Sequence, residues 1–490
     1  MKIRSRVARF AAVGTAFALA GPWAEASQLI AVGQLTGSSA GSYADLSALT
    51  GTLEDGSRMN LLGGLGSGLA WAGGNTFIAV PDRGPNASTY NPLVDNTTSY
   101  IDRLQTLQMT LTPTPGATLP FSLTPTLTAT TLLSSPTPLN YGSGALGTDA
   151  THTLGSGVPA LNAINHTNYF TGRSDNFAGS GSGNAANARL DPEGVRVSKD
   201  GRTVFVSDEY GPYVYQFDRS TGQRLRTYTL PSDLFVNTLG PTTGSEGTPF
   251  NSTGRVANKG MEGLAITPDG TTLVGVMQAP LLQDAGKTIR IVTIDVATGA
   301  TKQYAYNLTD GSGVSEIVAV NSHTFLLDER DGKGLGDGSN AAVKKLYKID
   351  LAGATPLPSN LAGTASQPND LSAFVVAKTQ VLDIRSTLVN AGIEITNALV
   401  PSKIEGVAFG SDVMLNGASW HTLWVANDND FSLDTAGTNQ FFVFALSDAD
   451  LGAIFEPQAI AAAVPEPETY ALYAGGLAVL AALARRRRRP

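Results

Sequence analysis

A strand–turn–strand pattern that recurs five times constrains the fold of this chain more than any other feature. In its clearest copy, residues 190–211, Val195 and Val197 alternate with polar neighbours, an Asp-Gly turn follows at 200–201, and a β-branched and aromatic run ends at Asp208. Alternation with a period of two around an Asp-Gly turn is typical of an antiparallel β-hairpin. The other copies occupy residues 67–84, 261–278, 315–331 and 404–428.

The repeat predicts an all-β chain that folds as a single β-propeller. Most copies are followed by a further alternating strand, so each unit has three or four antiparallel strands: residues 214–218, 289–295, 345–350 and 441–446. Such a unit, repeated along a chain, indicates a propeller blade. The spacing between copies is uneven, about 55 to 125 residues, which leaves room for insertions and for one unrecognised blade. We therefore expect six blades, of which five are recognisable.

Three stretches with biased composition are expected to be long connections between or within blades. They are the Thr/Pro-rich residues 110–138, the Gly/Ser/Asn-rich residues 172–187 and the similar residues 233–259. Gly, Pro, Ser and Asn favour turns and loops over regular elements, so these stretches are the natural places for the insertions.

The first 26 residues indicate export. Four basic residues come first, an apolar run follows from Phe10 to Ala20, and Ala24-Glu25-Ala26 provides an Ala-x-Ala cleavage site. This order is typical of a secretory signal peptide. The sequence therefore predicts a signal peptide at 1–26, a propeller domain at 27–463, and export across the inner membrane.

The last 27 residues resemble the PEP-CTERM sorting signal of Gram-negative bacteria. A Pro-Glu-Pro motif at 464–467 precedes an apolar stretch at 470–484 and an arginine cluster at 485–489. The apolar stretch is close to the lower length limit for a transmembrane helix, and the arginines favour a cytoplasmic C-terminus. The resemblance implies transient membrane anchoring, processing by an exosortase-type peptidase, and a mature protein in the cell envelope, on the surface or outside the cell. An ordinary C-terminal anchor is the alternative.

Charge and residue types narrow the chemistry of the domain. Nine of the 33 basic residues but only three of the 41 acidic residues lie in the terminal signals, so the domain between them carries about −14. A charge of this sign disfavours nucleic acid as a partner and favours cations, although a solvated acidic surface would give the same total. The absence of cysteine excludes thiolate catalysis, Cys-ligated zinc, iron–sulfur clusters and disulfides.

The hairpins are predicted to bring acidic residues together at one end of a central channel. In a propeller the innermost strands surround the channel, so residues before the first strand and after the second strand of each hairpin converge at its mouth. The candidates at these positions are Glu193, Glu262, Glu316, Glu405, Asp82, Asp208, Asp328 and Asp428. The ring is interrupted, because Ser67 and Gln278 occupy two equivalent positions.

Crowded carboxylates repel one another unless cations compensate them. Oxygen ligands without cysteine and with few histidines suit Ca²⁺ best and Mg²⁺ next, so all eight acids are candidate metal ligands. We expect Glu193, Glu262 and Asp208 to carry catalysis, and Arg83 and Arg330 to bind an anionic substrate. The alternative is structural, because acids at these positions also accept hydrogen bonds from backbone N–H groups of neighbouring blades.

The motifs around these acids resemble the phytase-like propeller family, whose described property is the esterase-like activity of phytase. They are residues 191–194 (Asp-Pro-Glu-Gly) with 207–212, residues 259–265 (Lys-Gly-Met-Glu-Gly-Leu-Ala) and residues 403–408 (Lys-Ile-Glu-Gly-Val-Ala). The resemblance covers roughly residues 55–450. It implies a propeller that hydrolyses phosphate esters, or carboxylic esters, with metal assistance. A non-catalytic surface propeller that binds a ligand, polysaccharide or matrix component is the alternative.

Overall fold

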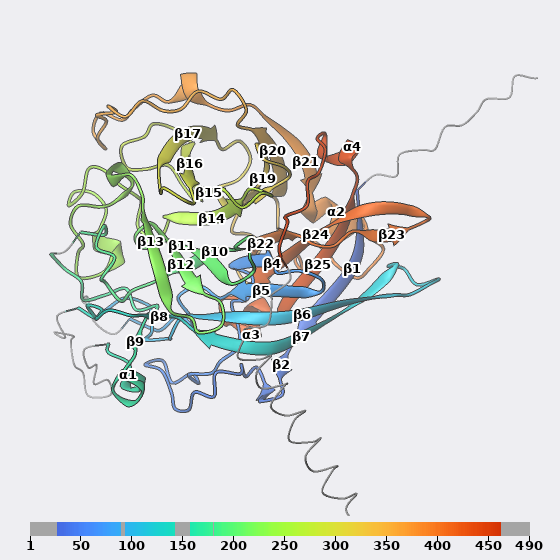
Figure 1. Ribbon diagram of the computed structural model, residues 1–490, viewed down its shortest axis with the longest axis horizontal. Coiled ribbons are helices and arrows are strands. Elements are labelled where there is room, and N and C mark those ends of the chain that lie inside the picture. The colour runs from blue at the N-terminus through green and yellow to red at the C-terminus, as the bar shows by residue number, and fades with distance from the viewer. Residues whose placement is uncertain (1–26, 90–93, 143–156, 180, 462–490) are drawn as a thin grey trace, which may run out of the picture.

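The chain forms a β-propeller of five four-stranded blades within the residues that the computed structural model describes, which are 27–89, 94–142, 157–179 and 181–461 (Figure 1). Both predicted terminal signals, 1–26 and 464–490, lie outside these residues. Within the described residues, no helix has the length and apolar character needed to cross a membrane.

Each blade is an antiparallel sheet whose first strand lies innermost, and the innermost strands of neighbouring blades pack against one another in a closed ring. From the channel outward, the first four blades consist of β4 (Gly68–Trp71), β5 (Thr76–Val80), β6 (Arg103–Pro113) and β7 (Phe121–Leu132); β10 (Pro192–Val197), β11 (Thr203–Asp208), β12 (Tyr213–Asp218) and β13 (Arg224–Thr229); β14 (Met261–Ile266), β15 (Thr272–Met277), β16 (Thr288–Asp295) and β17 (Thr301–Asn307); β18 (Gly313–Ala319), β19 (Thr324–Arg330), β20 (Lys344–Asp350) and β21 (Lys378–Asp383).

The fifth blade joins the two ends of the domain. Its strands β22 (Lys403–Phe409), β24 (Ala418–Asp428) and β25 (Asn439–Leu446) come from the end of the chain, whereas its outer strand β1 (Gln28–Leu35) comes from the beginning. β1 pairs with β25 in antiparallel register, from Gln28 opposite Ala445 to Leu35 opposite Asn439. A short strand, β23 (Val413–Leu415), pairs in antiparallel register with the first residues of β24.

The expectation of six blades is wrong, because the ring of described strands closes with five. The uneven spacing that suggested an extra blade comes from long connections, chiefly between β7 and β10, and from the unusually long outer strands of the first blade. Those strands also correct a second prediction. Residues 121–132, inside the Thr/Pro-rich stretch expected to be a connection, form β7, where Thr alternates with Leu and Pro125 is tolerated on an edge strand.

The remaining elements are short and lie in the connections. They are β2 (Gly37–Ser38), β3 (Gly41–Ser42), β8 (Ser134–Ser135), β9 (Asn168–Tyr169), α1 (Ala160–Asn165), α2 (Ile384–Asn390), α3 (Leu433–Ala436), α4 (Asp448–Leu451) and the 3₁₀ turns Ser232–Leu234, Thr243–Ser245 and Ser372–Phe374. No blade strand lies in the predicted connection 233–259 or in the part of 172–187 that the structure describes, as expected.

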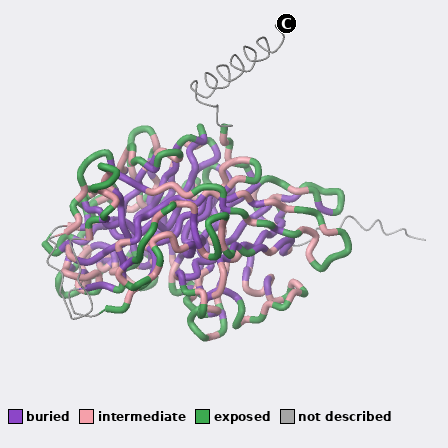
Figure 2. Tube along the Cα trace, turned by 90° about the horizontal axis from the view of Figure 1, so that it is seen from below, coloured by how far each residue is buried: buried purple, intermediate pink, exposed green. Residues whose placement is uncertain are grey.

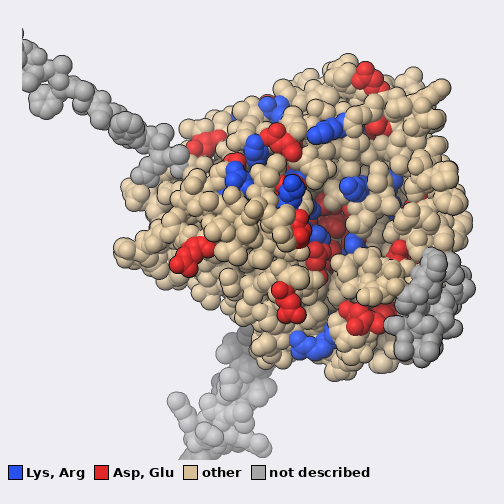
Figure 3. All heavy atoms as spheres, turned by 180° about the vertical axis from the view of Figure 1, so that it is seen from behind, with Lys and Arg blue, Asp and Glu red and all other residues tan. Residues whose placement is uncertain are grey.

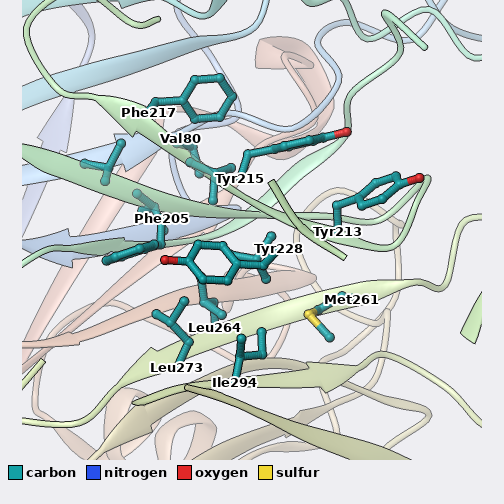
Figure 4. Close-up of a cluster of buried hydrophobic side chains, with 14 of the residues drawn as sticks. Val80, Phe205, Tyr213, Tyr215, Phe217, Tyr228, Met261, Leu264, Leu273 and Ile294 are labelled. Atoms are coloured by element: carbon teal, nitrogen blue, oxygen red, sulfur yellow. The ribbon is translucent and has the colours of Figure 1, made fainter. Parts of the chain in front are cut away.

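The core lies between neighbouring blades, where apolar side chains from one sheet face those of the next. In the second blade, Phe205 lies between Val80 of the first blade and Leu264 of the third, and Tyr215 lies on the side of Val80 (Figure 4). Figure 2 shows buried residues through the middle of the molecule and exposed residues mainly along the outer loops. This packing fixes the angle between blades and therefore the positions of the strand ends that surround the channel.

Candidate active site at the channel mouth

A β-bulge recurs in four blades, and in three of them it places a glutamate at the mouth of the channel. The register between the first two strands shifts at Glu193, Glu262 and Glu405 in three blades, whereas in β18 it shifts at Ser315, and Glu316 follows the bulge and pairs with Asp328. A bulge bends its strand and changes the direction of a side chain, which here turns toward the channel. The first blade has Ser67 at this place and no such shift.

The glycine that follows the glutamate in three blades serves packing between blades. A Cβ atom on Gly263 would lie 2.7 Å from the Cα of Glu316, and one on Gly194 would lie 2.6 Å from the backbone nitrogen of Leu264. Adjacent innermost strands therefore approach too closely for any other residue at these two positions. In each of these Glu-Gly pairs, the glutamate lines the pocket and the glycine allows the neighbouring strand to approach closely.

The channel mouth holds a cavity of about 230 Å³ that both acidic and basic side chains line. Figure 3 shows the face with Asp and Glu atoms at the bottom of a central hollow and Lys and Arg atoms around it. The charged residues of the lining are Asp82, Arg83, Glu193, Glu209, Lys259, Glu262, Arg330, Lys403 and Glu405. Of the eight predicted metal ligands, Asp82, Glu193, Glu262 and Glu405 are in this lining, and Asp208, Glu316, Asp328 and Asp428 are not.

Both arginines predicted to bind an anion line the pocket, and carboxylates hold each in place. Arg330 forms an ion pair with Glu405, donates from Nε to the Ser315 hydroxyl at 2.8 Å, and lies 3.7 Å from Glu262. Arg83 donates from its backbone N–H and from Nη1 to the carboxylate of Asp191, at 3.0 and 3.1 Å. These contacts orient the guanidinium groups before any ligand arrives.

Glu262 has the properties of a group that exchanges protons near neutral pH. Its Oε1 accepts a 2.7 Å hydrogen bond from the Gln278 amide, whereas Oε2 has no hydrogen-bond donor among the described residues. Burial, reinforced by the charge of Glu405, raises the pKa of Glu262 to about 8. Burial also raises the pKa of Glu405, to about 7.

A group of three acids lies on one side of the pocket. One carboxylate oxygen from each of Asp191, Glu193 and Glu209 lies within 4.8 Å of the others. Burial and then the charge of Glu262 raise the pKa of both Glu193 and Glu209 well above the usual range. Of the three, only Glu193 was predicted from the sequence as a site residue. Asp191 and Glu209 flank Glu193 and Asp208 in the best-preserved repeat, and that adjacency was the available signal.

A second group of three acids, Asp82, Asp428 and Asp430, lies on another side of the pocket and has a cation of its own. The Lys403 ammonium donates to Asp428 at 2.7 Å and to Asp430 at 2.5 Å. Asp82 accepts from the backbone N–H of Gly84 at 3.1 Å. Burial, followed by the charge of Asp428, raises the pKa of Asp82 well above its ordinary value.

Asp208 makes contacts of a structural kind. Its carboxylate accepts hydrogen bonds from the backbone N–H groups of Asp191, Tyr210 and Gly211 at 3.0–3.1 Å, while burial raises its pKa to about 7. Both oxygens of Asp328 are buried and have no donor among the described residues, and burial raises the pKa of Asp328 to about 7.

Glu316 belongs to a contact that crosses the channel below the pocket. Its Oε1 accepts from the backbone N–H groups of Leu264 and Ile317, and Oε2 lies 3.2 Å from Arg196. The Arg196 guanidinium donates to backbone carbonyls from four innermost strands: Leu69 of β4, Val195 of β10, Ile317 of β18 and Val407 of β22. Sequence analysis gave no sign of this contact.

The last described residues cross the opposite end of the channel. Glu456 donates its backbone N–H to Val320, the Gln458 amide donates to Val197, and the backbone N–H of Ala459 donates to Pro268. Together with Arg196, this segment separates that end from the acidic pocket. A ligand therefore reaches the pocket from the face shown in Figure 3.

The carboxylate oxygens of Asp191, Glu193 and Glu209 are hard ligands, and those of Glu209 are buried and accept no hydrogen bond from the described residues. This set fits a divalent cation of the Ca²⁺ type. The chemistry available at the pocket is then anion binding by guanidinium groups, proton transfer by Glu262, and cation binding by carboxylates.

Comparison with known proteins gives a family and a distant relative. The model of the phytase-like family, described as "Esterase-like activity of phytase", matches residues 60–431. A protein of Arthroderma benhamiae (strain ATCC MYA-4681 / CBS 112371), named "Uncharacterized secreted protein", is 28% identical over 425 residues, which are 78% of each chain.

Solved structures give weaker similarities. A luciferin-regenerating enzyme is 10% identical, covers 82% of this chain and 96% of its own, and has a TM-score of 0.30. The PQQ-bound aldose sugar dehydrogenase of Streptomyces coelicolor is 10% identical, covers 82% and 84%, and has a TM-score of 0.29. At these scores neither structure bears on the function of this chain.

Proposed function

Because the chain belongs to the phytase-like family, we propose that it hydrolyses ester bonds of anionic substrates, phosphate esters first, in the pocket at the channel mouth. The observation that carries the proposal is the meeting of oriented guanidinium groups and high-pKa carboxylates in one cavity. Phosphate ester hydrolysis needs both, because the negative charge on the phosphoryl oxygens must be stabilised and protons must move.

Arg83 and Arg330 bind the phosphoryl oxygens of the substrate in this proposal. Each already has its guanidinium group oriented by a carboxylate, so binding requires little reorganisation. Lys259 and Lys403 add positive charge to the pocket lining. The substrate class is therefore an anion with several oxygen atoms, such as an alkyl or inositol phosphate.

Glu262 acts as the general acid. The oxygen of a water molecule bonds to phosphorus as the ester P–O bond breaks, and the leaving alkoxide takes the proton from Glu262 Oε2, which has no hydrogen-bond partner among the described residues. The attacking water loses a proton as phosphate forms, and the Glu262 carboxylate is reprotonated from solvent. A pKa of about 8 keeps most of the acid protonated at neutral pH.

A divalent cation, Ca²⁺ by the character of the ligands, supplies polarisation of the phosphoryl oxygen and activation of the water when it is bound. Glu193, which was predicted to be both catalytic and metal-binding, lies in the pocket lining close to the carboxylates of Asp191 and Glu209. The chain's part in this chemistry is to hold those carboxylates close together, so that a bound cation can offset their mutual repulsion.

For the cellular setting, we propose export followed by removal of the C-terminal segment by an exosortase-type peptidase. The support is the signal-like sequence at both ends and the secreted description of the Arthroderma relative. Mass spectrometry of the mature protein tests this, because it should begin near Ser27 and end near the Pro-Glu-Pro motif. Intact termini would contradict processing.

The activity test compares phosphate release from phytate and p-nitrophenyl phosphate with hydrolysis of p-nitrophenyl acetate. We expect phosphate release that chelator abolishes and that added Ca²⁺ restores, and a raised KM when Arg83 or Arg330 is replaced by Gln. Hydrolysis of the acetate alone would move the substrate class to carboxylic esters. No hydrolysis of any ester would favour the non-catalytic propeller that binds a surface ligand or polysaccharide.

A further inference from the structure

We propose that one divalent cation binds between the carboxylates of Asp191, Glu193 and Glu209, and that the Asp82, Asp428 and Asp430 group does not bind one. The catalytic use of this cation rests on the proposed function, but the binding site itself does not. Asp191 and Glu209 were not among the acids that the sequence selected, so the proposal moves the metal site to one side of the predicted ring.

The three carboxylates come together because of how one hairpin begins and ends. Asp191 immediately precedes β10, Glu193 lies in the bulge of β10, and Glu209 follows the last residue of β11. The backbone N–H of Glu209 donates to the Asp191 carbonyl at 3.0 Å, which fixes the two ends relative to each other. Ligand oxygens within 4.8 Å of one another match a single Ca²⁺, whose oxygen ligands lie at about 2.3–2.6 Å from the ion.

Glu209 is the residue that points to a ligand. Its side chain lines the pocket, yet the residue is only 1% exposed and both carboxylate oxygens lack a hydrogen-bond donor among the described residues. Gly260 packs directly on the backbone of Glu209, where a Cβ atom would lie 1.9 Å from its carbonyl oxygen. The neighbouring blade thus packs on the backbone of Glu209 and contributes to its burial. A buried carboxylate that accepts no hydrogen bond and lies beside two other carboxylates is stable only if a cation or a proton neutralises its charge.

The second acidic group, Asp82, Asp428 and Asp430, does not need a bound cation to offset its charge. Lys403 donates to both Asp428 and Asp430, so the centre of that group already has an ammonium ion. In the first group, the ion pair that the described residues form is that of Arg83 with Asp191. Neither Glu193 nor Glu209 forms an ion pair among the described residues, so their oxygens are available to a bound ion.

The position of Arg83 defines how a substrate would meet the cation. Arg83 is 11% exposed in its side chain, bonds to Asp191 at 3.1 Å and to the amide oxygen of Asn258 at 2.7 Å, and lines the same cavity as Glu193 and Glu209. Ca²⁺ takes six to eight oxygen ligands, so three carboxylates leave positions for water and for one substrate oxygen. A phosphoryl group can then touch the cation through one oxygen and Arg83 through another.

The test is calorimetric titration of Ca²⁺ into the metal-free full-length protein, its Glu209→Gln variant and its Asp430→Asn variant. The Glu209→Gln change is isosteric and introduces an amide that can donate to Asp191, so the fold should persist; melting temperatures without Ca²⁺ check this. We expect one Ca²⁺ per wild-type chain, binding weakened more than about tenfold by Glu209→Gln, and binding within about threefold of wild type for Asp430→Asn. Ca²⁺ should raise the melting temperature of the wild type and of Asp430→Asn but not of Glu209→Gln.

The outcomes separate this site from the proposed activity. Unchanged Ca²⁺ binding in Glu209→Gln, loss of binding in Asp430→Asn, or no Ca²⁺ binding by the wild type would each overturn the site; the last would mean that Asp191 and Glu209 share a proton instead. Loss of binding only in Glu209→Gln, without ester hydrolysis by the wild type, would support the site and contradict the activity.

Discussion

Replacing Arg196 with Met removes the contact that crosses the channel and should destabilise the whole ring. Arg196 is 4% exposed and donates four hydrogen bonds of 2.6–3.2 Å to carbonyls of four blades, while its Nη2 lies 3.2 Å from Glu316. Glu316 in turn accepts from Leu264 of the remaining blade. The variant leaves four carbonyls and one carboxylate buried without their cation.

Breaking a buried ion pair from one side costs about 3–5 kcal/mol, so we expect a loss of about 4 kcal/mol in the free energy of unfolding. Urea denaturation followed by tryptophan fluorescence and circular dichroism measures it. Exposed Arg202 provides the matched control, because Arg202→Met should change the free energy by less than about 0.5 kcal/mol.

A double-mutant cycle tests the pairing itself. Glu316→Gln keeps the acceptor oxygen for two backbone N–H groups and removes the charge, so the Arg196→Met and Glu316→Gln effects should overlap by about 2 kcal/mol. A loss below about 1 kcal/mol for Arg196→Met, or strict additivity of the two changes, would refute the view that this pair holds the blades together.

Three further predictions follow from the same structure. Without divalent cations, the urea midpoint should rise as the pH falls from 8 to 5. The reason is that Glu262 and Glu405, with pKa values of about 8 and 7, hold protons in the folded chain at pH values where the unfolded chain, with a pKa of 4.5, has released them. Equal midpoints at pH 5 and pH 8 would contradict this prediction. Asp208→Ala should cost about 3 kcal/mol in urea denaturation because three backbone N–H groups lose their acceptor, and Asp208→Asn should cost less; equal costs would argue against the capping role. Gly263→Ala should lower the melting temperature strongly, since its Cβ would lie 2.7 Å from the Cα of Glu316, whereas Gly244→Ala, with no atom within 4 Å of a Cβ, should be tolerated; similar melting temperatures for the two variants would contradict the packing argument.

The blades could be predicted from sequence because their signals are local. Alternation indicates the strands of the inner hairpins, and in the second and third blades the Asp-Gly turns at Gly201 and Gly270, both with positive φ, mark the turn as well. The number of blades could not be counted in the same way. The strand that closes the ring, β1, pairs with β25 more than 400 residues later, and its own sequence carries no mark of that partner.

The site could be predicted only in part, because equivalent positions in the repeats do different work. Glu193 and Glu262 lie in the bulges of their strands and line the pocket, while Glu316 follows the bulge of β18, accepts from Leu264 and faces Arg196 below the pocket. Asp208 satisfies backbone N–H groups, and its neighbour Glu209 enters the pocket instead. Which neighbour faces the cavity depends on contacts from other blades, such as that of Gly260 on Glu209, and a pattern within one repeat does not contain them.

The central claim is that the pocket hydrolyses phosphate esters with Glu262 as the proton donor. The direct measurement is kcat/KM for p-nitrophenyl phosphate and for an alkyl phosphate such as phytate, as a function of pH, for the wild type and Glu262→Gln with Ca²⁺ present. We predict that Glu262→Gln lowers kcat/KM for phytate by about 10²–10⁴-fold and abolishes the alkaline limb, with a smaller loss for p-nitrophenyl phosphate, whose leaving group needs less protonation. Equal kcat/KM values for the two proteins on phytate, or a wild type that releases no phosphate, would contradict the claim.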